Sequence, residues 1–172
     1  IKDRVVTTPM HYAYLKIAEG CSNHCTYCAI PGIRGKFRSR KFESIITEAV
    51  HLAESGVKEL ILVAQDTTKY GIDLYGELRL SELVKEIAKL DGIEWIRLLY
   101  CYPESITDEL IEVIADESKV CKYIDLPLQH CNEQVLKRMN RKGNRQYLTD
   151  LINKMRKAIP DLTLRTTFIT GF

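Results

Sequence analysis

The chain carries the stretch Cys21-Ser22-Asn23-His24-Cys25-Thr26-Tyr27-Cys28 close to its beginning. Three thiols in so short a loop can converge on one soft metal centre, because thiolate is the ligand that iron–sulfur clusters and zinc select. No fourth cysteine follows at ligand spacing. A four-iron cluster held by three thiolates would therefore keep one iron open for a ligand that is not protein.

Two other interpretations of this loop stay open at the level of the residues. A zinc site could recruit His24, His130 or Cys131 as a fourth ligand, since zinc prefers four nitrogen or sulfur ligands. His24 lies between two of the thiols and is poorly placed to complete the same shell. A disulfide with one free thiol would suit a small secreted protein, which this composition does not resemble.

The composition is that of an ordinary globular domain. The 172 residues are 45% hydrophobic and 28% charged, and the formal net charge is only +2, so no global field marks a nucleic-acid binder. The sequence has no run of 18 apolar residues and no signal-peptide pattern, so we expect no membrane partner. Six cysteines without such a signal predict a cytoplasmic protein, where closely spaced thiols usually bind metal.

Downstream of the cysteines, apolar runs of strand length alternate with helical patterns. We expect strands at 12–18, 59–64, 95–100, 122–128 and 162–169, and helices over about 41–55, 80–91, 108–114, 132–140 and 146–158. The run at 59–64 is nearly all apolar, as in a strand buried on both faces of a parallel sheet. The repeat predicts an α/β fold with a parallel sheet, and periodicity alone does not decide between a doubly wound sheet and a barrel.

Polar residues follow these strands at the edge where parallel βα proteins bind ligands. They should line one mouth together with the cysteine loop; they are Gln65, Asp66, Tyr102, Gln129, His130, Thr170 and Gly171. Arg165 would pair either with a ligand carboxylate or with a surface acid. His130 is more simply a hydrogen-bonded structural residue than a proton donor. Cys101, Cys121 and Cys131 are expected to be free thiols.

The spacing C-x3-C-x2-C with Tyr27 before the third cysteine resembles the radical S-adenosylmethionine (SAM) superfamily. Longer stretches narrow this resemblance to its methylthiotransferases: Gly20 to Pro31, Arg34-Gly35, Arg38-Ser39-Arg40, and Pro127-Leu128-Gln129-His130 with Val135-Leu136, Met139 and Arg141. The resemblance implies a partial, open TIM-like barrel of six βα units, of which this chain would end after the fifth strand. It also implies that Cys21, Cys25 and Cys28 hold one 4Fe–4S cluster whose open iron binds SAM.

The same resemblance implies further site residues and a substrate. The SAM-contacting residues would be Tyr27, Gln65, Asp66, Gln129, Arg165 and Gly171. The stretches Phe37–Arg40 and Gln65–Gly71 resemble the branch that methylthiolates the β-carbon of an aspartate in a small-subunit ribosomal protein. The alternatives are the branch that modifies a transfer-RNA adenosine, and a non-catalytic zinc-binding module.

The resemblance also implies a longer protein. Residues 1–11 would be a linker from an amino-terminal domain that carries a second 4Fe–4S cluster, and residues 12–172 an incomplete radical SAM core. An electron-donor protein would reduce the cluster. The run Arg34–Lys41 has five basic residues in eight positions, and we expect it to attract a macromolecular substrate, with Arg38 and Arg40 both taking part.

Overall fold

The computed structural model describes residues 7–172, so part of the expected linker, residues 1–6, lies outside the described residues. Within 7–172, five parallel strands form one sheet in the order β1, β4, β5, β6, β7. They are β1 (Tyr12–Lys16), β4 (Glu59–Val63), β5 (Trp95–Leu98), β6 (Val120–Asp125) and β7 (Thr163–Arg165). Each strand lies beside the one before it in the sheet, and the order never reverses. A doubly wound sheet requires a reversal, so the topology is that of an open, barrel-like βα repeat.

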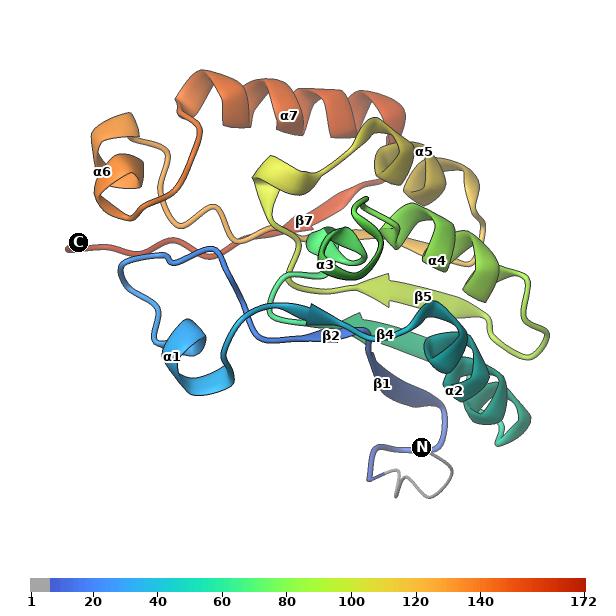
Figure 1. Cartoon of the computed structure of the whole chain (residues 1–172). Coiled ribbons are helices and arrows are strands. Elements are labelled where there is room, and N and C mark those ends of the chain that lie inside the picture. The colour runs from blue at the N-terminus through green and yellow to red at the C-terminus, as the bar shows by residue number, and fades with distance from the viewer. Residues whose placement is uncertain (1–6) are drawn as a thin grey trace.

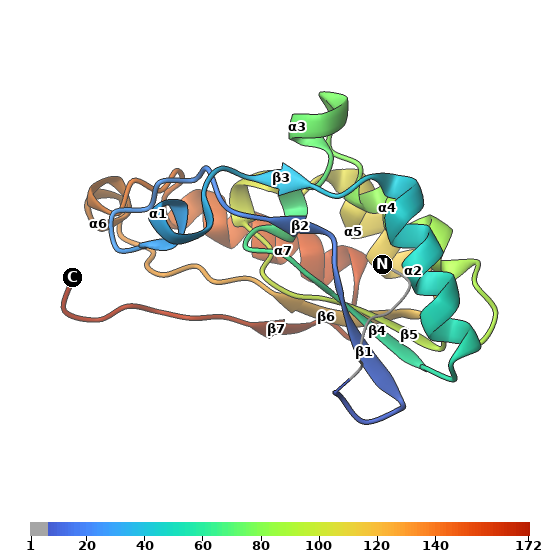
Figure 2. The same ribbon diagram turned by 60° about the horizontal axis from the view of Figure 1, so that its bottom comes forward.

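Helices connect the strands and cover one face of this sheet (Figures 1 and 2). The crossovers contain α2 (Phe42–Glu54), α4 (Leu80–Ala88), α5 (Asp108–Asp116), and, between β6 and β7, α6 (Glu133–Arg138) with α7 (Arg145–Ala158). Figure 2 shows α2, α4, α5 and α7 on the same side of the strands. This arrangement follows because right-handed crossovers between sequentially ordered strands all place their helices on one side.

The core lies between the sheet and these helices. Alternate strand residues are buried beneath the helices, namely Ala13, Leu15, Leu60, Leu62, Ile96, Leu98 and Ile124. The intervening residues point to the face without helices, where Tyr14 is 42% and Trp95 52% exposed. Thr107 caps the amino terminus of α5, because its side chain accepts a hydrogen bond from the Leu110 amide.

The expected strand over 12–18 is wrong as a single element. The Ile17 amide still donates to the Val63 carbonyl at 3.0 Å. The chain then diverges and continues as β2 (Ala18–Glu19), which pairs antiparallel with β3 (Arg38–Ser39). The Ile17 carbonyl accepts from the Arg40 amide instead of continuing the ladder. The other four expected strands also end earlier than their apolar runs: β4 at Val63, β5 at Leu98, β6 at Asp125 and β7 at Arg165.

Two short helices lie outside the predicted elements: α1 (Ile30–Arg34) and α3 (Ile72–Tyr75). α1 directly follows the cysteine loop, with Pro31 in its first turn. α3 projects at the top of the view in Figure 2. It carries Asp73, whose carboxylate accepts from the Ser39 amide and hydroxyl at 2.9 and 2.6 Å. β2 and β3 form a small antiparallel ribbon (the β2–β3 ribbon), and the cysteine loop and α1 lie in the connection between its two strands.

Arg40 has a structural role that the charge pattern did not indicate. Its guanidinium donates to the Lys16 carbonyl at 2.7 Å and to the Glu48 carboxylate at 2.6 Å, and Glu48 is only 8% exposed. These contacts give Arg40 a task within the fold, and its expected part in attracting a substrate stays a prediction. Arg38, by contrast, is exposed on β3.

Candidate metal and cofactor site

The cysteine loop begins at Gly20, whose backbone conformation only glycine readily adopts. Its φ is +79°, and a Cβ at this position would lie 2.2 Å from the Lys36 carbonyl oxygen. The Gly20 amide donates to Gln65 Oε1 at 2.6 Å, and the Cys21 amide donates to the Gly35 carbonyl at 3.1 Å. The loop is thereby attached on one side to the end of β4 and on the other to the end of α1.

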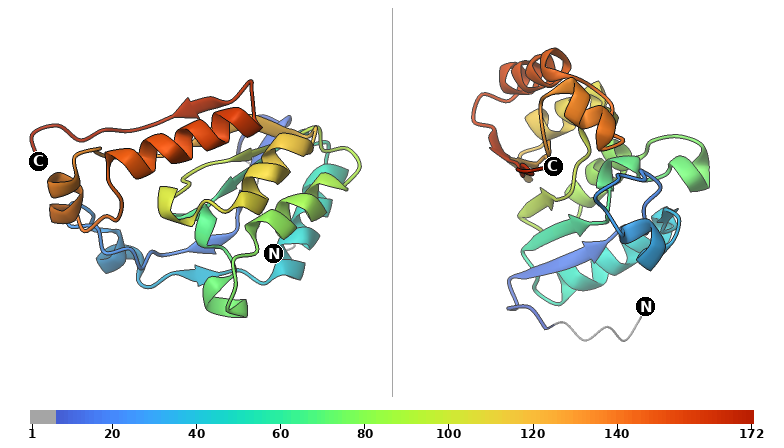
Figure 3. Two further views of the ribbon diagram at one scale, coloured as in Figure 1. Left: turned by 90° about the horizontal axis from the view of Figure 1, so that it is seen from above. Right: turned by 90° about the vertical axis from the view of Figure 1, so that its left-hand side faces the viewer.

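The far side of the loop is held by the segment that follows α6. The Thr26 amide donates to the Met139 carbonyl at 3.1 Å, and the Thr26 hydroxyl donates to the Arg138 carbonyl at 2.9 Å. Asn140 Nδ2 donates to the His24 carbonyl at 2.9 Å. Two segments more than 100 positions apart in the sequence therefore determine the shape of the loop; Figure 3 shows α6 beside it.

All three cysteines of the loop line one cavity of about 170 Å³ at the carboxyl ends of the strands. Its other walls include Tyr27 of the same loop and residues from the segments that follow β4, β5, β6 and α6, namely Gln65, Tyr102, Gln129 and Arg141. A second hollow of about 360 Å³ adjoins it and shares Cys21, Cys28, Gln65 and Tyr100. The thiols thus face a space large enough for a small cofactor beside them.

The donor set fits an iron–sulfur cluster, because three thiols line one cavity and thiolate is the ligand that such clusters take. A cluster accepts each thiolate at a different iron, so its ligands need only surround the cavity. His24, which lies within the same loop, is exposed.

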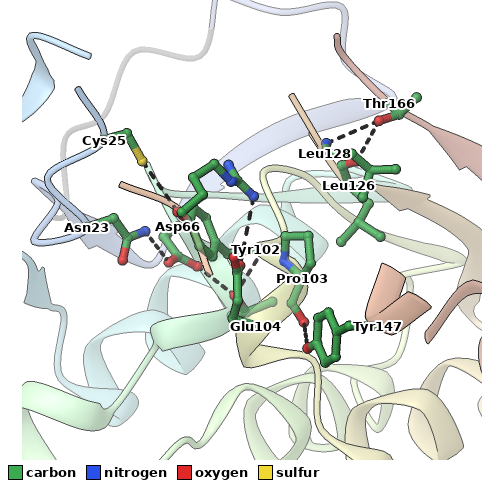
Figure 4. A network of polar contacts seen from close by, with 12 residues as sticks. Asn23, Cys25, Asp66, Tyr102, Pro103, Glu104, Leu126, Leu128, Tyr147 and Thr166 are labelled. Carbon is green, nitrogen blue, oxygen red and sulfur yellow. Dashed lines mark hydrogen bonds and ion pairs between the residues drawn. The ribbon is translucent and has the colours of Figure 1, made fainter. Parts of the chain in front are cut away.

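Three of the six residues predicted to contact SAM line the cysteine cavity: Tyr27, Gln65 and Gln129. Asp66 lies below it and is fully buried. Its carboxylate accepts from Asn23 Nδ2 at 2.9 Å and from the Thr68 hydroxyl at 2.6 Å (Figure 4). Asp66 therefore anchors the cysteine loop to the end of β4, and any direct contact with SAM stays a prediction.

The expectation of one shared mouth is wrong for three residues. Gly171, Thr170 and His130 line a separate hollow with Phe168 and Phe172. There β6 and β7 continue beyond their ladder through the Gln129–Phe168 bridge, which carries the later residues away from the cysteines. His130 Nδ1 accepts from the Asn132 amide at 2.9 Å, which agrees with a structural histidine.

Arg165, the last residue of β7, pairs with Asp125, the last residue of β6. Its guanidinium donates to Asp125 Oδ1 at 2.9 Å, while its own side chain is 59% exposed and the Asp125 side chain only 1%. The other Asp125 oxygen accepts from the Tyr100 amide at 3.1 Å. Tyr100 has a φ of +57° and lines both cavities. Arg165 thus supports a wall of the site through Asp125, and its contact with SAM stays a prediction.

The remaining cysteines lie as free thiols, as expected. Cys121 is the second residue of β6, at the opposite end of that strand from the cavity. Cys131 is exposed. Cys101 is buried at the cavity wall, 3.6 Å from the Thr67 hydroxyl, and burial raises the pKa of its thiol to about 12.

Sequence reasoning did not assign a role in the site to Arg141, although its position belongs to a quoted motif. Its guanidinium carbon lies 4.1 Å from the centre of the Tyr102 ring, and its Nη1 donates to the Tyr27 hydroxyl at 3.2 Å. The Tyr102 hydroxyl lies 3.3 Å from Cys25 Sγ (Figure 4). The neighbouring Asn140 was a signal in the sequence that the chain changes direction before Arg141. Asparagine after a helix often adopts the left-handed conformation, as Asn140 does here.

Burial determines the protonation of groups around the cavity. Desolvation raises the pKa of Tyr27 to about 12 and that of the Cys21 thiol above its ordinary value. It also raises the pKa of Tyr102, and the neighbouring Cys25 acts in the same direction. Both phenols are therefore protonated near neutral pH and can donate hydrogen bonds.

Comparison with known proteins agrees with this geometry. Residues 15–172 match the family model described as "Radical SAM superfamily". The chain is 61% identical over 169 residues to a protein of Clostridium tetani (strain Massachusetts / E88), named ribosomal protein uS12 methylthiotransferase RimO. The alignment covers 98% of the chain and 38% of that relative. A protein of the same name from Clostridioides difficile (strain 630) is also 61% identical, with the same coverage. The chain thus spans well under half the length of these relatives.

Solved structures agree on the fold. The radical SAM methyltransferase TsrM from Kitasatospora setae, solved with cobalamin and a [4Fe-4S] cluster, superposes with a TM-score of 0.68 at 15% identity, covering 91% of this chain and 30% of that one. The cobalamin-dependent SAM radical enzyme OxsB gives 0.67 at 15% identity, covering 91% and 23%. No helix within residues 7–172 combines the length and apolar character needed to cross a membrane.

Proposed function

Because the chain belongs to the radical SAM superfamily, we propose that it is the SAM-cleaving core of an enzyme that methylthiolates the β-carbon of an aspartate in ribosomal protein uS12. The superfamily implies a 4Fe–4S cluster and SAM. The observation that carries the proposal is the cavity onto which Cys21, Cys25 and Cys28 all open. The names of the 61% identical relatives support the substrate.

The three cysteines would hold a 4Fe–4S cluster through one thiolate each, with one iron left for SAM. When bound, this group supplies the electron that cleaves SAM to a radical able to abstract hydrogen from the substrate carbon. Gln65 Oε1 already accepts from the Gly20 amide, so its Nε2 is the atom that can donate to a ligand carboxylate. Tyr27 and Gln129 offer a ring and an amide to the remainder of SAM.

Two residues predicted to bind SAM act in this proposal mainly as supports. Asp66 holds Asn23 of the cysteine loop, and Arg165 holds Asp125 beneath Tyr100. Gly171 lies in the neighbouring hollow and would contact only a ligand that extends there. In this proposal residues 12–172 form the radical SAM core and residues 1–11 form a linker. The other parts of the longer relatives would hold a second 4Fe–4S cluster and substrate contacts, and a separate protein would donate the electron.

The metal content of the anaerobically reconstituted chain tests the proposal. We expect about four irons and four sulfides per chain, and release of 5′-deoxyadenosine after reduction in the presence of SAM. Cys21→Ala, Cys25→Ala and Cys28→Ala should each abolish both results, while Cys121→Ala, at the far end of β6, should abolish neither. Stoichiometric zinc in place of iron would refute the radical SAM function.

The substrate is tested separately with the full-length enzyme. Mass spectrometry of uS12 and of transfer RNA after reaction should detect a methylthio group on the aspartate and none on the adenosine. The reverse result would assign the chain to the transfer-RNA branch of the family.

A further inference from the structure

We propose that Arg141 is a positioning residue that holds the Tyr102 hydroxyl on Cys25, and that this hydrogen bond tunes the reduction potential of the cluster. The inference rests on the proposed function, since it requires a cluster at Cys25. Three thiolates could bind the cluster without Arg141. The inference therefore gives a separate task to this buried cation on the wall of the cysteine cavity.

The position of Arg141 is unusual for a charged residue. Its side chain is only 3% exposed. Its Nη1 donates to the Tyr27 hydroxyl at 3.2 Å, while its Nε has no hydrogen-bond partner and is buried. The nearest acid is Glu104, at 3.8 Å from Nη2 to Oε2, and this carboxylate oxygen also has no hydrogen-bond partner. A buried ion pair with such loose geometry contributes little to stability, so fold stability alone does not account for it.

The contacts of Arg141 instead converge on two tyrosines of the cavity wall. The guanidinium carbon lies 4.1 Å from the centre of the Tyr102 ring, which is stacking distance, while the same group is hydrogen-bonded to Tyr27. A planar guanidinium can stack and donate at the same time, and a lysine ammonium cannot reproduce both contacts. Lys69 Nζ lies farther from the same ring, at 5.8 Å from its centre. Arg141 is therefore the closer cation that holds the Tyr102 ring in place.

The position of the Tyr102 ring places its hydroxyl 3.3 Å from Cys25 Sγ. Once Cys25 is a thiolate ligand, the phenol is the donor of this hydrogen bond. Hydrogen bonds to cluster sulfurs are among the factors that set reduction potential, because they stabilise the more electron-rich reduced state. Partners beyond the ligands also orient the ligands themselves. Loss of the Tyr102 hydroxyl should accordingly lower the potential.

The opposite side of the Tyr102 loop is fixed independently of Arg141. The Tyr102 amide donates to the Thr68 hydroxyl at 3.1 Å, and Tyr147 donates to the Pro103 carbonyl at 3.1 Å (Figure 4). The backbone at Tyr102 therefore has its own supports. Replacement of Arg141 should release mainly the ring.

The test is a redox titration of the reconstituted chain and four variants. Tyr102→Phe and Arg141→Lys should load iron like the parent chain and should lower the potential by similar amounts. The double variant should show no further decrease, because both changes remove the same hydrogen bond. The matched control is Arg97→Lys: Arg97 stacks on Tyr123 at 5.1 Å but lies on β5 away from the cysteine cavity, and its replacement should leave the potential unchanged.

The outcomes separate this inference from the proposed function. Absence of a cluster in the parent chain would refute both. A loaded parent chain whose potential is unchanged in Arg141→Lys, or whose two single shifts add in the double variant, would refute only the positioning role. If Arg141→Lys takes up no iron, Arg141→Gln replaces it, with the same decrease expected. Loss of iron in both Arg141 variants would assign Arg141 to the fold and overturn the inference.

Discussion

At the scale of single residues, the site depends on what burial does to individual groups. Cys101 is 1% exposed beside the cysteine cavity, and its thiol has a pKa raised from 9.0 to about 12 because the thiolate would lose its hydration there. It therefore remains a neutral thiol in the folded chain over a range in which the unfolded chain ionises it.

This difference predicts how the contribution of Cys101 to stability depends on pH. A thiol whose folded pKa is raised contributes fully below the unfolded value of 9.0 and loses its contribution as pH rises towards 12. The free energy of unfolding of the metal-free chain, relative to Cys101→Ala, should thus fall by up to about 1.4 kcal/mol per pH unit above 9. Urea denaturation at several pH values measures this, and a constant difference would contradict the assigned burial.

Residue types predicted the site only in part. The three cysteines, Tyr27, Gln65 and Gln129 all line the cavity. Polar residues after strands were a weaker guide, because an Asp or Arg in such a place can either face a ligand or support its neighbours. Asp66 and Arg165 support their neighbours, through contacts with Asn23 and Asp125 that lie 43 and 40 positions away. No local pattern encodes such contacts.

At the scale of elements, Gly20 and the β2–β3 ribbon hold the start of the cysteine loop. Gly20→Ala should strongly reduce iron loading. The new Cβ would meet the Gly35 and Lys36 backbone at 2.7 and 2.2 Å, and the left-handed conformation alone costs on the order of 1–2 kcal/mol. Gly32→Ala in α1 is the matched control, since a Cβ there meets nothing within 4 Å and should leave loading intact. Normal iron content in Gly20→Ala would show that the loop tolerates another path.

The basic run provides a second prediction, for β3 and the residue that follows it. Arg40→Ala removes a charge partner of Glu48, which is 8% exposed, and should destabilise the chain by on the order of 3 kcal/mol in chemical denaturation. Arg38→Ala, on exposed β3, should change the free energy of unfolding by less than about 0.5 kcal/mol. Equal effects would mean that the Arg40–Glu48 pair contributes nothing.

Periodicity predicted the long elements and missed the short ones for a physical reason. Helices such as α2 and α4 carry apolar faces that repeat over several turns, and each of the five expected strands is present. α1, α3 and the two-residue strands β2 and β3 are too short to show a period. Tertiary contacts stabilise them instead, such as those of Asp73 with Ser39.

At the scale of the whole molecule, the strand order decides between a doubly wound sheet and a barrel-like sheet, which periodicity could not do. Sequential order without reversal leaves one face of the sheet free of helices and gathers the carboxyl ends of the strands at one mouth. The cysteine loop, α1 and the β2–β3 ribbon lie together at that mouth (Figures 1 and 3). A macromolecular substrate of the proposed reaction would approach over this rim, where the basic run presents the exposed cations Arg34, Lys36, Arg38 and Lys41.

This placement predicts a docking role for Lys36 and Arg38, while the Arg40 guanidinium is already bonded to the Lys16 carbonyl and the Glu48 carboxylate. Lys36→Glu with Arg38→Glu in the full-length enzyme should reduce modification of the proposed ribosomal substrate by about tenfold at low salt, because reversed charges would repel the target carboxylate or neighbouring ribosomal RNA. Screening should narrow the difference as salt increases. Cluster content and uncoupled SAM cleavage should be unchanged, since neither residue lines the cysteine cavity. Lys85→Glu with Lys157→Glu is the matched control, because it reverses two exposed charges on α4 and α7 and should have no effect. An equal loss of uncoupled SAM cleavage in the first pair would instead place Lys36 and Arg38 in the cofactor site.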